Sequence, residues 1–456
     1  MRFERGAAIE ATGARTLAPD LLPAALKVQT DTRTLERGAT FLALRGERFD
    51  GHAYVDEAFA RGAACAIVDD PRSVPPGQPA LVVGDTLAAY LALGELARRS
   101  LHGPVVGITG STGKTTTKQF LLGLLRGAGI SCAATPENEN NEVGVAKFLC
   151  GLERGDPRVA IAEMGARKYR DLDLLVAAAR PDIGVLTNVG EAHLEIMGTR
   201  ERIAETKWAL PAGARRAVLN LADEVSRERA ASLAAEPLWF GIDGEQPPRG
   251  QAAIVVEPDS VWSVDGDGAT ETHRLRIAFP GDHNRRNLAA AFAAGMLCGA
   301  VPRDLAAAAE TLALPPGRYE VLELGSDVRL VFDAYNASLS GTLATLATFG
   351  HEAASRRIAV LGGMAELGDD APAMHEKVGE IAAKRAHVVL AGGHFARDTA
   401  RGVEGEGGVV VRYASNDDAT VWLRENVRPG DAILLKGSRR YKMEEIARAL
   451  GAEGFP

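Results

Sequence analysis

A chain of 456 residues is too long to be built around one hydrophobic core, so we expect about three domains of ordinary size. Its 46% hydrophobic and 25% charged residues are typical of a globular protein and exclude a largely disordered one. The net charge of −8 excludes broad binding to nucleic acid or to an anionic membrane surface, so an anionic ligand must be held by local positive groups.

The four cysteines lie far apart and form no C-x-x-C pair, which predicts reduced thiols rather than a disulfide framework. No apolar run of signal-peptide length follows Met1, and none is long enough to span a membrane. We therefore expect a cytoplasmic enzyme without membrane insertion. The cysteines are Cys65, Cys132, Cys150 and Cys298.

Residues 1–98 are predicted to form a small α/β domain. The stretches 40–44 and 64–68 are typical of strands, and 54–61 and 87–98 of helices. Taken alone, the polar stretches between these elements would be solvated turns. They are Thr30–Arg33 and Arg45–His52.

A strand, a glycine-rich turn and a helix are predicted for residues 105–125. In such a turn the backbone N–H groups bind phosphate oxygens, a lysine reaches the distal phosphates, and a hydroxyl ligates Mg²⁺. The common spacing of this motif requires a glycine where this chain has Ile108, so the loop is a variant. The apolar strand and the Gly-Lys-Thr-Thr sequence favour a triphosphate site over an ordinary turn. The predicted cradle consists of Gly110, Ser111, Thr112, Gly113, Lys114, Thr115 and Thr116.

Two further strands of the predicted central domain, residues 99–314, end in polar side chains. The strand 159–163 ends in Glu163, and His193 follows the strand 183–189. Ligands of open α/β sheets bind beyond the carboxyl ends of the strands, so we expect these side chains to converge with Thr115. A hydroxyl, a carboxylate and an imidazole beside triphosphate oxygens can hold Mg²⁺. Individually, the glutamate can also be a helix-cap partner and the histidine a loop residue.

The end of the central domain is predicted to be less regular than its start. Residues 243–276 are polar and rich in Gly, Asp and Pro, so we expect an irregular excursion there. A helix is predicted from Asp282 to Cys298, and Pro315-Pro316-Gly317 marks the next domain boundary.

Residues 315–456 alternate regularly between strands and helices, which predicts a parallel, Rossmann-like sheet. The sequence G-x-G-x-x-G does not follow the first strand, which argues against a dinucleotide site. The predicted strands are 329–332, 358–361, 388–390, 409–412 and 432–435.

Twelve short motifs, taken in chain order, make this sequence similar to the Mur ligases, the ATP-dependent amide-forming enzymes of peptidoglycan synthesis. Each motif alone is weak, but the ordered set is specific and covers nearly the whole chain. The motifs are D-T-R (31–33), R-G-E-R-F-D-G-H (45–52), G-I-T-G-S-T-G-K-T-T-T-K (107–118), T-P-E-N-E-N-N-E-V-G-V (135–145), E-M-G (163–165), T-N-V-G-E-A-H-L-E (187–195), K-W (207–208), G-D-H-N-R-R-N (281–287), P-G-R (316–318), D-A-Y-N-A (333–337), L-G-G-M-A-E-L-G (361–368) and K-G-S-R (436–439).

The resemblance implies three α/β domains that act as a monomer with ATP and Mg²⁺. The N-terminal domain would bind a UDP-sugar, the central P-loop domain ATP, and the C-terminal Rossmann-like domain an incoming dipeptide. In the implied reaction a peptide carboxylate attacks the γ-phosphate to give an acyl phosphate, and an amine then displaces phosphate. Closure of the three domains around the substrates would exclude water from the acyl phosphate.

The resemblance also implies roles for individual residues. Lys114, Glu163, His193 and Lys207 would be catalytic, and Thr115, Glu163, His193 and Lys207 would form the metal site. On sequence alone Lys207 would be a solvated helix lysine, whereas the resemblance implies a carbamate, whose formation needs a neutral amine with a lowered pKa. Beyond the cradle, ATP would contact Asn141, Asn284, Asn287, Arg318 and Asp333. The substrates would contact Asp31, Thr32, Arg33, Arg45, Asp50, Gly51, His52, Tyr335, Asn336, Lys436 and Ser438.

Within the family, the motifs favour the ligase that adds D-alanyl-D-alanine to UDP-N-acetylmuramoyl-tripeptide. The nearest alternative is the ligase that adds the third amino acid, which usually carries D-Y-A-H-x-P where this chain has D-A-Y-N-A-S-L. Ser338-Leu339 stand where the resemblance implies Asn-Pro, in a segment that lies near the nucleotide in the family, so the resemblance leaves the adenine contacts there open. Less favoured alternatives are a folate polyglutamate-type ligase, a P-loop switch protein and an inactive relative. A switch protein would not require the set Glu163, His193 and Lys207.

Overall fold

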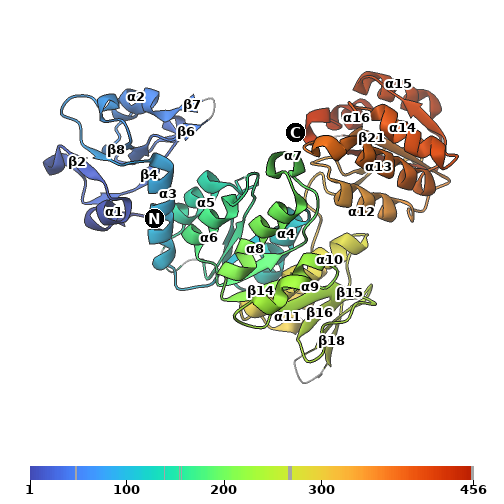
Figure 1. The fold of residues 1–456 in the computed structure, drawn as a ribbon, viewed down its shortest axis with the longest axis horizontal. Coiled ribbons are helices and arrows are strands. Elements are labelled where there is room, and N and C mark those ends of the chain that lie inside the picture. The colour runs from blue at the N-terminus through green and yellow to red at the C-terminus, as the bar shows by residue number, and fades with distance from the viewer. Residues whose placement is uncertain (47–48, 138, 154, 156, 265–269, 453–456) are drawn as a thin grey trace.

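The computed structural model describes residues 1–46, 49–137, 139–153, 155, 157–264 and 270–452. Three main β-sheets follow one another along the chain, each with its own helices (Figure 1). The predicted three-domain α/β architecture is therefore confirmed, while the residue-level boundaries after 98 and 314 stay predictions. Among the residues described, no helix is long and apolar enough to cross a membrane.

The N-terminal sheet has five short strands in the order β2-β9-β8-β5-β4, and only β2 is antiparallel to its neighbour. The strands predicted at 40–44 and 64–68 and both predicted helices are present. Two further pairs, β1 with β3 and β6 with β7, form separate two-stranded sheets. The strands of the domain are β1 (Phe3–Glu4), β2 (Arg15–Leu17), β3 (Ala25–Leu26), β4 (Val28–Gln29), β5 (Thr40–Leu42), β6 (Arg45–Gly46), β7 (Phe49–Asp50), β8 (Cys65–Val68) and β9 (Ala80–Val82). The helices are α1 (Arg5–Thr12), α2 (Val55–Ala60) and α3 (Thr86–Arg99).

The central sheet has nine strands in the order β11-β12-β10-β13-β14-β15-β16-β17-β18. The first six strands of this order, together with β16, are parallel. The strands are β10 (Val105–Thr109), β11 (Cys132–Ala134), β12 (Val159–Glu163), β13 (Ile183–Leu186), β14 (Arg216–Asn220), β15 (Leu238–Ile242), β16 (Ala253–Val256), β17 (Ser260–Val264) and β18 (Thr270–Arg274). The helices are α4 (Lys114–Gly127), α5 (Glu142–Gly151), α6 (Asp171–Ala179), α7 (Leu194–Met197), α8 (Arg200–Gly213), α9 (Glu224–Arg229), α10 (Asp282–Leu297) and α11 (Pro302–Ala309).

Helices cover both faces of this sheet, which explains why its strands are continuous apolar runs. Successive residues of a strand point to opposite faces, so Val159 and Ile161 lie in one core and Ala160 and Ala162 in the other. Helices α4, α10 and α11 cover the first face, and α5, α6 and α8 cover the second.

The prediction of an irregular excursion over residues 243–276 was wrong. Strands β16 to β18 extend the central sheet, and β17 is antiparallel to both of its neighbours. All residues of β16 are buried, whereas β18 is mostly exposed at the sheet edge. An edge hairpin can be polar on its solvated side, so the polar composition concealed these strands. Residues 265–269 lie outside the described chain.

The C-terminal sheet has six strands in the order β19-β20-β24-β21-β22-β23. It is parallel as predicted, except for the antiparallel edge strand β19, which the sequence analysis missed. Helices α12, α13 and α14 cover one face, and α15 and α16 cover the other. The strands are β19 (Glu320–Glu323), β20 (Arg329–Phe332), β21 (Arg356–Gly363), β22 (Val388–Ala391), β23 (Val410–Arg412) and β24 (Asp431–Gly437). The helices are α12 (Leu339–Phe349), α13 (Ala371–Arg385), α14 (Ala396–Gly405), α15 (Asn416–Asn426) and α16 (Glu444–Ala449).

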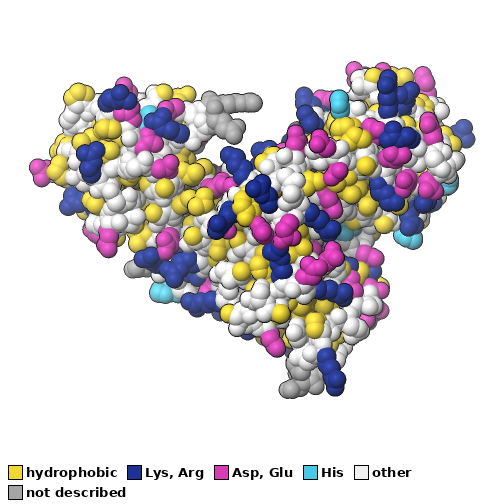
Figure 2. All heavy atoms as spheres, in the orientation of Figure 1, with side chains coloured by type: hydrophobic (Ala, Val, Ile, Leu, Met, Phe, Trp, Pro, Cys, Tyr) yellow, Lys and Arg dark blue, Asp and Glu magenta, His cyan; other side chains and the backbone are white. Residues whose placement is uncertain are grey.

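The N-terminal and C-terminal domains lie on either side of the central domain (Figure 1). Helix α3 connects the first two domains and packs against α5 and α6. Figure 2 shows a notch between the two outer domains, with Lys and Arg side chains gathered on its floor. A positively charged notch suits an anionic ligand even though the whole chain is acidic.

Candidate active site

The glycine-rich turn between β10 and α4 is shaped by close contacts with neighbouring segments. Gly110 has φ +151°, and a Cβ there would lie 1.8 Å from the hydroxyl oxygen of Thr187. Gly113 has φ +80°, and a Cβ there would lie 2.3 Å from Oδ1 of Asn287. Glycine is therefore required at both positions. Ile108 is fully buried within β10, so the turn of this variant loop begins only at Gly110.

The segment after β13 holds this turn in place. The amide N–H of Thr112 donates to Oδ1 of Asn188 at 3.0 Å, and the hydroxyl of Thr187 donates to the carbonyl of Thr112 at 2.6 Å. The amide N–H of Ser111 donates to the carbonyl of Asn188 at 2.9 Å. The first N–H groups of a helix have no partner within the helix, so those at the start of α4 can donate to a phosphate bound at this turn.

Lys114, the first residue of α4, bends back over the turn. Its ammonium donates to the carbonyl of Gly110 at 2.7 Å. Burial lowers the pKa of this lysine, while the carboxylate of Glu163 opposes that shift. The cation is thus held next to the cradle, where it would contact the distal phosphates.

Glu163 ends β12 beside the start of α4, as predicted. Its Oε1 accepts hydrogen bonds from the hydroxyl of Thr115 at 3.1 Å and from the amide of Asn140 at 2.9 Å. Oε2 lies 3.1 Å from the ammonium of Lys118 but accepts no hydrogen bond within the described part of the chain. Burial opposes ionisation of Glu163, but Lys118 and Lys114 hold the pKa of its carboxyl below the usual value.

This arrangement fits Mg²⁺, which prefers oxygen ligands. Glu163 supplies a buried anionic oxygen that accepts no hydrogen bond from the residues the structure describes, and Thr115 supplies an adjacent hydroxyl. No group of three His, Cys, Asp or Glu side chains among the described residues can hold a metal by itself. A bound Mg²⁺ would therefore need nucleotide oxygens and water to complete its ligand shell.

His193 lies farther along the same edge of the sheet and faces the C-terminal domain. Its Nδ1 lies 2.5 Å from Oε2 of Glu366, and no hydrogen bond or ion pair joins it to Thr115 or Glu163 among the described residues. Burial lowers the pKa of the imidazole despite Glu366, and the ammonium groups of Lys207 and Lys114 lower it further. The histidine is therefore within electrostatic reach of both lysines without direct contact with the Thr115–Glu163 pair.

Lys207 is 2% exposed, so the alternative of a solvated helix lysine was wrong. It lies on α8, which approaches the sheet closely because Gly107 and Gly184 have no side chains. A Cβ would lie 2.7 Å from Cδ1 of Leu210 at the first glycine and 2.9 Å from the carbonyl oxygen of Leu210 at the second. Burial, together with the charge of Lys114, lowers the pKa of Lys207 to about 7. The neutral amine that a carbamate requires is therefore accessible near neutral pH, and the carbamate itself stays a prediction.

The other predicted nucleotide residues lie on both sides of the junction between the central and C-terminal domains. Oδ1 of Asn141 accepts a hydrogen bond from the N–H of Gly144 at 2.9 Å and caps α5. The amide of buried Asn284 donates to the carbonyl of Pro280 at 2.9 Å, and Asn287 packs against Gly113. In the C-terminal domain the guanidinium of Arg318 lies 4.2 Å from the ring centre of Tyr335, and Asp333 accepts from the hydroxyl of Thr345.

Three residues predicted from the C-terminal motifs, Asp333, Lys436 and Ser438, are buried around the segment 333–337, whose Asn336 is itself exposed. The ammonium of Lys436 lies 3.1 Å from Oδ2 of Asp333 and donates to the carbonyl of Asn336 at 2.8 Å. Ser438 donates to the carbonyl of Ala337 at 3.4 Å. Burial lowers the pKa of Lys436, and Asp333 opposes that shift. Strand β24 thus holds the segment 333–337 in place through side-chain contacts.

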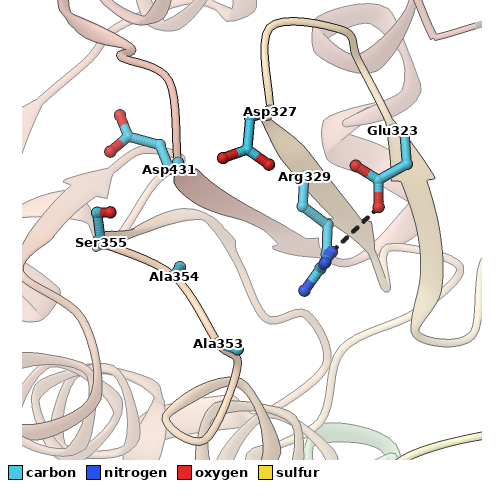
Figure 3. A pocket seen from close by; sticks show the side chains of 8 residues that line it. Glu323, Asp327, Arg329, Ala353, Ala354, Ser355 and Asp431 are labelled. Atoms are coloured by element: carbon cyan, nitrogen blue, oxygen red, sulfur yellow. Dashed lines mark hydrogen bonds and ion pairs between the residues drawn. The ribbon is translucent and has the colours of Figure 1, made fainter.

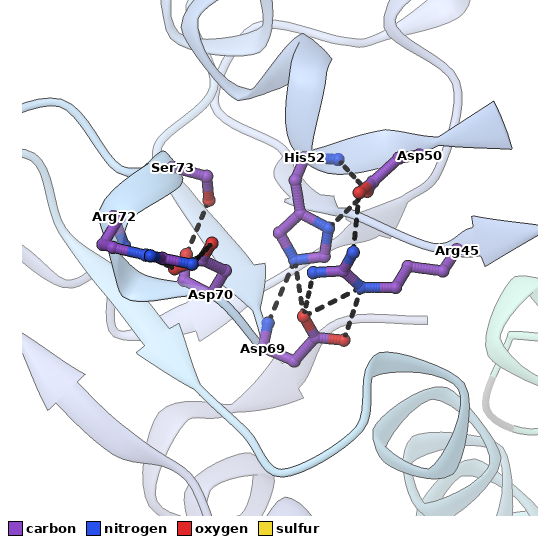
Figure 4. Close-up of polar contacts among 7 residues, drawn as sticks. All are labelled: Arg45, Asp50, His52, Asp69, Asp70, Arg72 and Ser73. Carbon is purple, nitrogen blue, oxygen red and sulfur yellow. Dashed lines mark hydrogen bonds and ion pairs between the residues drawn. The ribbon is translucent and has the colours of Figure 1, made fainter.

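In the N-terminal domain, the predicted substrate residues form two separate groups. In the first, Nδ1 of His52 lies 2.7 Å from Asp50, and Nε2 accepts the N–H of Asp69 at 3.1 Å (Figure 4). Arg45 pairs with Asp50 at 2.7 Å and with Asp69 at 2.8 Å. Gly51 belongs to this group because a Cβ there would lie 2.7 Å from the carbonyl of Leu44. Both ring nitrogens of His52 are engaged in these contacts, so the side chain holds the loop in place. Residues 47–48 of that loop lie outside the described chain.

The second group is a short 3₁₀ turn. Asp31 caps this turn and pairs with Arg33 at 2.7 Å, while Thr32 is buried. The Arg33 side chain, followed by its backbone N–H, lowers the pKa of Asp31 to about 2. No hydrogen bond or ion pair between described residues joins this turn to the group around His52.

Several site residues were missed in the sequence. Lys118 is completely buried and contacts Glu163; its position one helical turn after Lys114 was a usable signal. Asp69 directly follows the buried strand β8, which was the same kind of signal that identified Glu163. Glu366, by contrast, comes from another domain, and no local pattern in the sequence links it to His193.

A pocket of about 280 Å³ lies elsewhere in the C-terminal domain (Figure 3). Its lining includes Arg329, Ser355 and Asp431, at or next to the first residues of β20, β21 and β24. Ligands of open parallel sheets bind at the carboxyl ends of strands, so this pocket lies at the opposite edge from the candidate site.

Three family models match the chain in succession. They are the Mur ligase family catalytic domain over residues 27–99, the Mur ligase middle domain over residues 108–295, and the Mur ligase glutamate ligase domain over residues 317–439.

Curated relatives match over nearly the whole chain. The UDP-N-acetylmuramoyl-tripeptide–D-alanyl-D-alanine ligase of Bacillus subtilis is 33% identical, over 93% of this chain and 92% of its own. The enzymes of the same name from Synechocystis and Escherichia coli are 35% and 31% identical, over 93% and 94% of this chain and 91% and 94% of theirs.

Solved structures of MurF enzymes are also similar to this chain over nearly its whole length. A crystal structure of MurF from Acinetobacter baumannii superposes with a TM-score of 0.85 at 26% identity, covering 99% of each chain. MurF ligase from Thermotoga maritima in complex with ADP superposes with a TM-score of 0.79 at 28% identity, covering 93% of this chain and 97% of that one.

Proposed function

Because the chain belongs to the Mur ligase family, we propose that it is the ligase that joins D-alanyl-D-alanine to UDP-N-acetylmuramoyl-tripeptide with ATP and Mg²⁺. One structural observation carries this proposal. A phosphate cradle, an oxygen-donor pair and a buried lysine of low pKa lie together on one side of the central domain, next to the C-terminal domain. A switch protein needs the cradle but has no use for the lysine.

In the proposed reaction the terminal carboxylate of the tripeptide attacks the γ-phosphorus of ATP. A P–O bond to the acyl oxygen forms, and the bond to the ADP oxygen breaks. The neutral amine of D-alanyl-D-alanine then attacks the acyl carbon and loses a proton, while phosphate leaves with the electron pair of the C–O bond. Phosphoryl transfer of this kind depends mainly on positioning and on neutralisation of charge.

Lys114 and the N–H groups at the start of α4 would hold the distal phosphates and neutralise the charge that develops on them. Glu163 and Thr115 would hold one Mg²⁺, and His193 with carbamylated Lys207 would hold a second. When bound, these ions neutralise phosphate charge and draw the acceptor carboxylate towards ATP. The remaining nucleotide contacts would come from Asn141, Asn284, Asn287, Arg318 and Asp333.

The proposal extends to the parts of the molecule that bind the other substrates. Residues 1–98 would bind the UDP-sugar through the Asp31–Arg33 turn and the Arg45–His52 loop. Residues 99–314 would bind ATP, and residues 315–456 the dipeptide, with Tyr335, Asn336, Lys436 and Ser438 close to it. The enzyme would act as a monomer in the cytoplasm, which light scattering and cell fractionation can test.

The decisive experiment measures phosphate release from ATP with UDP-N-acetylmuramoyl-tripeptide, with and without D-alanyl-D-alanine. We expect release only when both substrates are present, together with the mass of the UDP-muramoyl-pentapeptide. If D-alanyl-D-alanine gave nothing while a UDP-muramoyl-dipeptide and a diamino acid reacted, the ligase adding the third residue would replace this proposal. If neither reaction released phosphate, the substrate assignment would be refuted.

A further inference from the structure

Glu366 of the C-terminal domain reaches into the central domain and contacts a predicted metal ligand. It lies in the loop after β21, and its Oε2 is 2.5 Å from Nδ1 of His193. Its Oε1 pairs with the guanidinium of Arg167 at 2.7 Å. The side chains of His193 and Glu366 are 25% and 31% exposed, so the contact is partly shielded from water.

The backbone holds both partners in unusual conformations. His193 has φ +63° and Glu366 has φ +62°, a region that residues other than glycine rarely adopt. Such conformations persist only where the surrounding structure holds them, and they are concentrated at functional sites. A backbone hydrogen bond at 3.2 Å from the N–H of Glu195 to the carbonyl of Glu366 joins the two loops directly. In Figure 1, α7, which follows His193, lies at the end of the central domain next to the C-terminal domain.

The chemistry of the pair defines what each atom can do. A carboxylate has no proton to give, so Nδ1 of His193 must be the donor in this contact. The other ring nitrogen, Nε2, then carries the lone pair and is the atom available to a metal. Both oxygens of Glu366 are already engaged, by His193 and by Arg167, so Glu366 does not itself offer a free ligand atom.

We propose that Glu366 is a positioning residue that fixes the tautomer and ring orientation of His193 from the C-terminal domain. Histidines that bind metals commonly donate their second nitrogen to a carboxylate in this way. Here the carboxylate belongs to a different domain from the ligand, so the metal site is complete only while the C-terminal domain is docked. This inference rests on the proposed function, in which His193 holds Mg²⁺ beside the acceptor carboxylate.

A matched control can separate an effect of Glu366 on His193 from a general effect of Glu366 on docking of the C-terminal domain. R167Q removes the ion pair between Arg167 and Glu366, which spans the same domain junction, but leaves the contact between Glu366 and His193. E366Q removes the charge that holds the Nδ1 proton. If Glu366 acts through His193, E366Q should also have no further effect in the H193A background, because a double-mutant cycle isolates the coupling of the pair.

The first measurement is the histidine ¹⁵N NMR spectrum of the full-length protein, with the His193 signals identified by their loss in H193A. We expect E366Q, but not R167Q, to change the tautomer signature of His193. The second is Mn²⁺ binding by electron paramagnetic resonance with a non-hydrolysable ATP analogue and UDP-N-acetylmuramoyl-tripeptide. We expect E366Q to weaken binding at the second metal position about 10- to 100-fold, and R167Q less than about threefold.

The proposal would be overturned if E366Q and R167Q weakened Mn²⁺ binding equally, or if E366Q still weakened it in the H193A background. Glu366 would then be only a docking contact between the domains. An unchanged His193 tautomer in E366Q would overturn it as well. Failure of the ligase reaction is a separate result. If the wild-type protein made no pentapeptide, the substrate assignment would fall, while the His193 spectrum would still decide whether Glu366 positions the ring.

Discussion

At the scale of single residues, Lys207 links the burial of one helix position to the chemistry of the site. Its ammonium loses water and gains no carboxylate partner among the described residues, so burial and Lys114 bring its pKa to about 7. Carbamate formation converts this cation into an anion: the ammonium first loses one proton, and the amine nitrogen then bonds to the carbon of CO₂ with loss of a second proton. The charge of Lys207 therefore depends on both the pH and the concentration of CO₂.

We expect carbamate occupancy to fall as the pH decreases at constant dissolved CO₂, and to fall more steeply below about 7, where the amine is protonated. The measurement is the ¹³C NMR signal of the protein after addition of ¹³C-bicarbonate. K207R is the control, because arginine stays charged and cannot form the carbamate. A signal that persists in K207R would show that another amine is modified.

Lys118 and Glu163 form a buried ion pair, with side chains 0% and 4% exposed. Because Glu163 has a lowered pKa in the folded state, its ionisation stabilises the protein above the unfolded pKa, and this contribution is lost as the pH falls through the folded pKa. Removing Lys118 leaves a buried carboxylate with fewer counter-charges. We expect K118M to destabilise the protein by about 3 kcal/mol at pH 8, and by less at pH 5, where Glu163 can take up a proton.

Urea unfolding at the two pH values measures this difference. The control is K147M, which breaks the exposed pair between Lys147 and Glu139 and should change stability by less than about 1 kcal/mol. If K118M lost the same free energy of unfolding at both pH values, packing of the lysine stem rather than its charge would account for the stabilisation.

At the scale of secondary-structure elements, the position of α8 decides whether Lys207 is buried. Gly184 lets the helix approach β13 until a Cβ would be 2.9 Å from both the carbonyl of Leu210 and Cβ of Ala214. We expect G184A to destabilise the protein by about 1–3 kcal/mol and to lower carbamate occupancy, since the displaced helix admits water to Lys207. Thermal melting and the ¹³C signal report the two effects.

Gly151, the last residue of α5, serves as the control for this substitution. A Cβ there would have no atom within 4 Å, so G151A should leave both stability and carbamate occupancy unchanged. If G184A were equally harmless, the close approach of α8 would not be what keeps Lys207 buried.

The sequence predicted elements well wherever a local pattern determines them. The predicted strands 159–163 and 329–332 agree with the structure residue for residue, because runs of apolar residues buried on both faces identify central strands. The strands β16 to β18 were missed because a polar edge hairpin resembles a loop in composition. The contacts of Lys207 with its surroundings and of Glu366 with His193 could not be predicted, since they depend on helix-to-sheet distance and on domain docking.

At the scale of the whole molecule, the three domains are not equally independent. One hydrophobic core runs from Leu42 and Ile67 of the N-terminal sheet through Leu93 of α3 to Leu149 of α5. The two apolar cores of the C-terminal sheet include no residue before Leu314. A shared core couples the unfolding of the elements that form it.

Differential scanning calorimetry should therefore resolve two transitions rather than three, with the first two domains unfolding together. L93A removes buried volume on the connecting helix and should lower the midpoint of only the shared transition, by an amount equivalent to about 2–5 kcal/mol. Three separate transitions in the wild-type protein would contradict this view of the core.

The same shared core limits how the fold can be recombined between relatives. The first family match ends at residue 99, at the last residue of α3, which suggests a natural place for exchanging substrate-binding modules. A chimera joined there would place a foreign α3 on the native α5 and α6, where Gly94 lies close to the backbone of Ala146. We therefore expect such an exchange to give a stable protein only if the facing surfaces of α5 and α6 are transferred together with the N-terminal sheet.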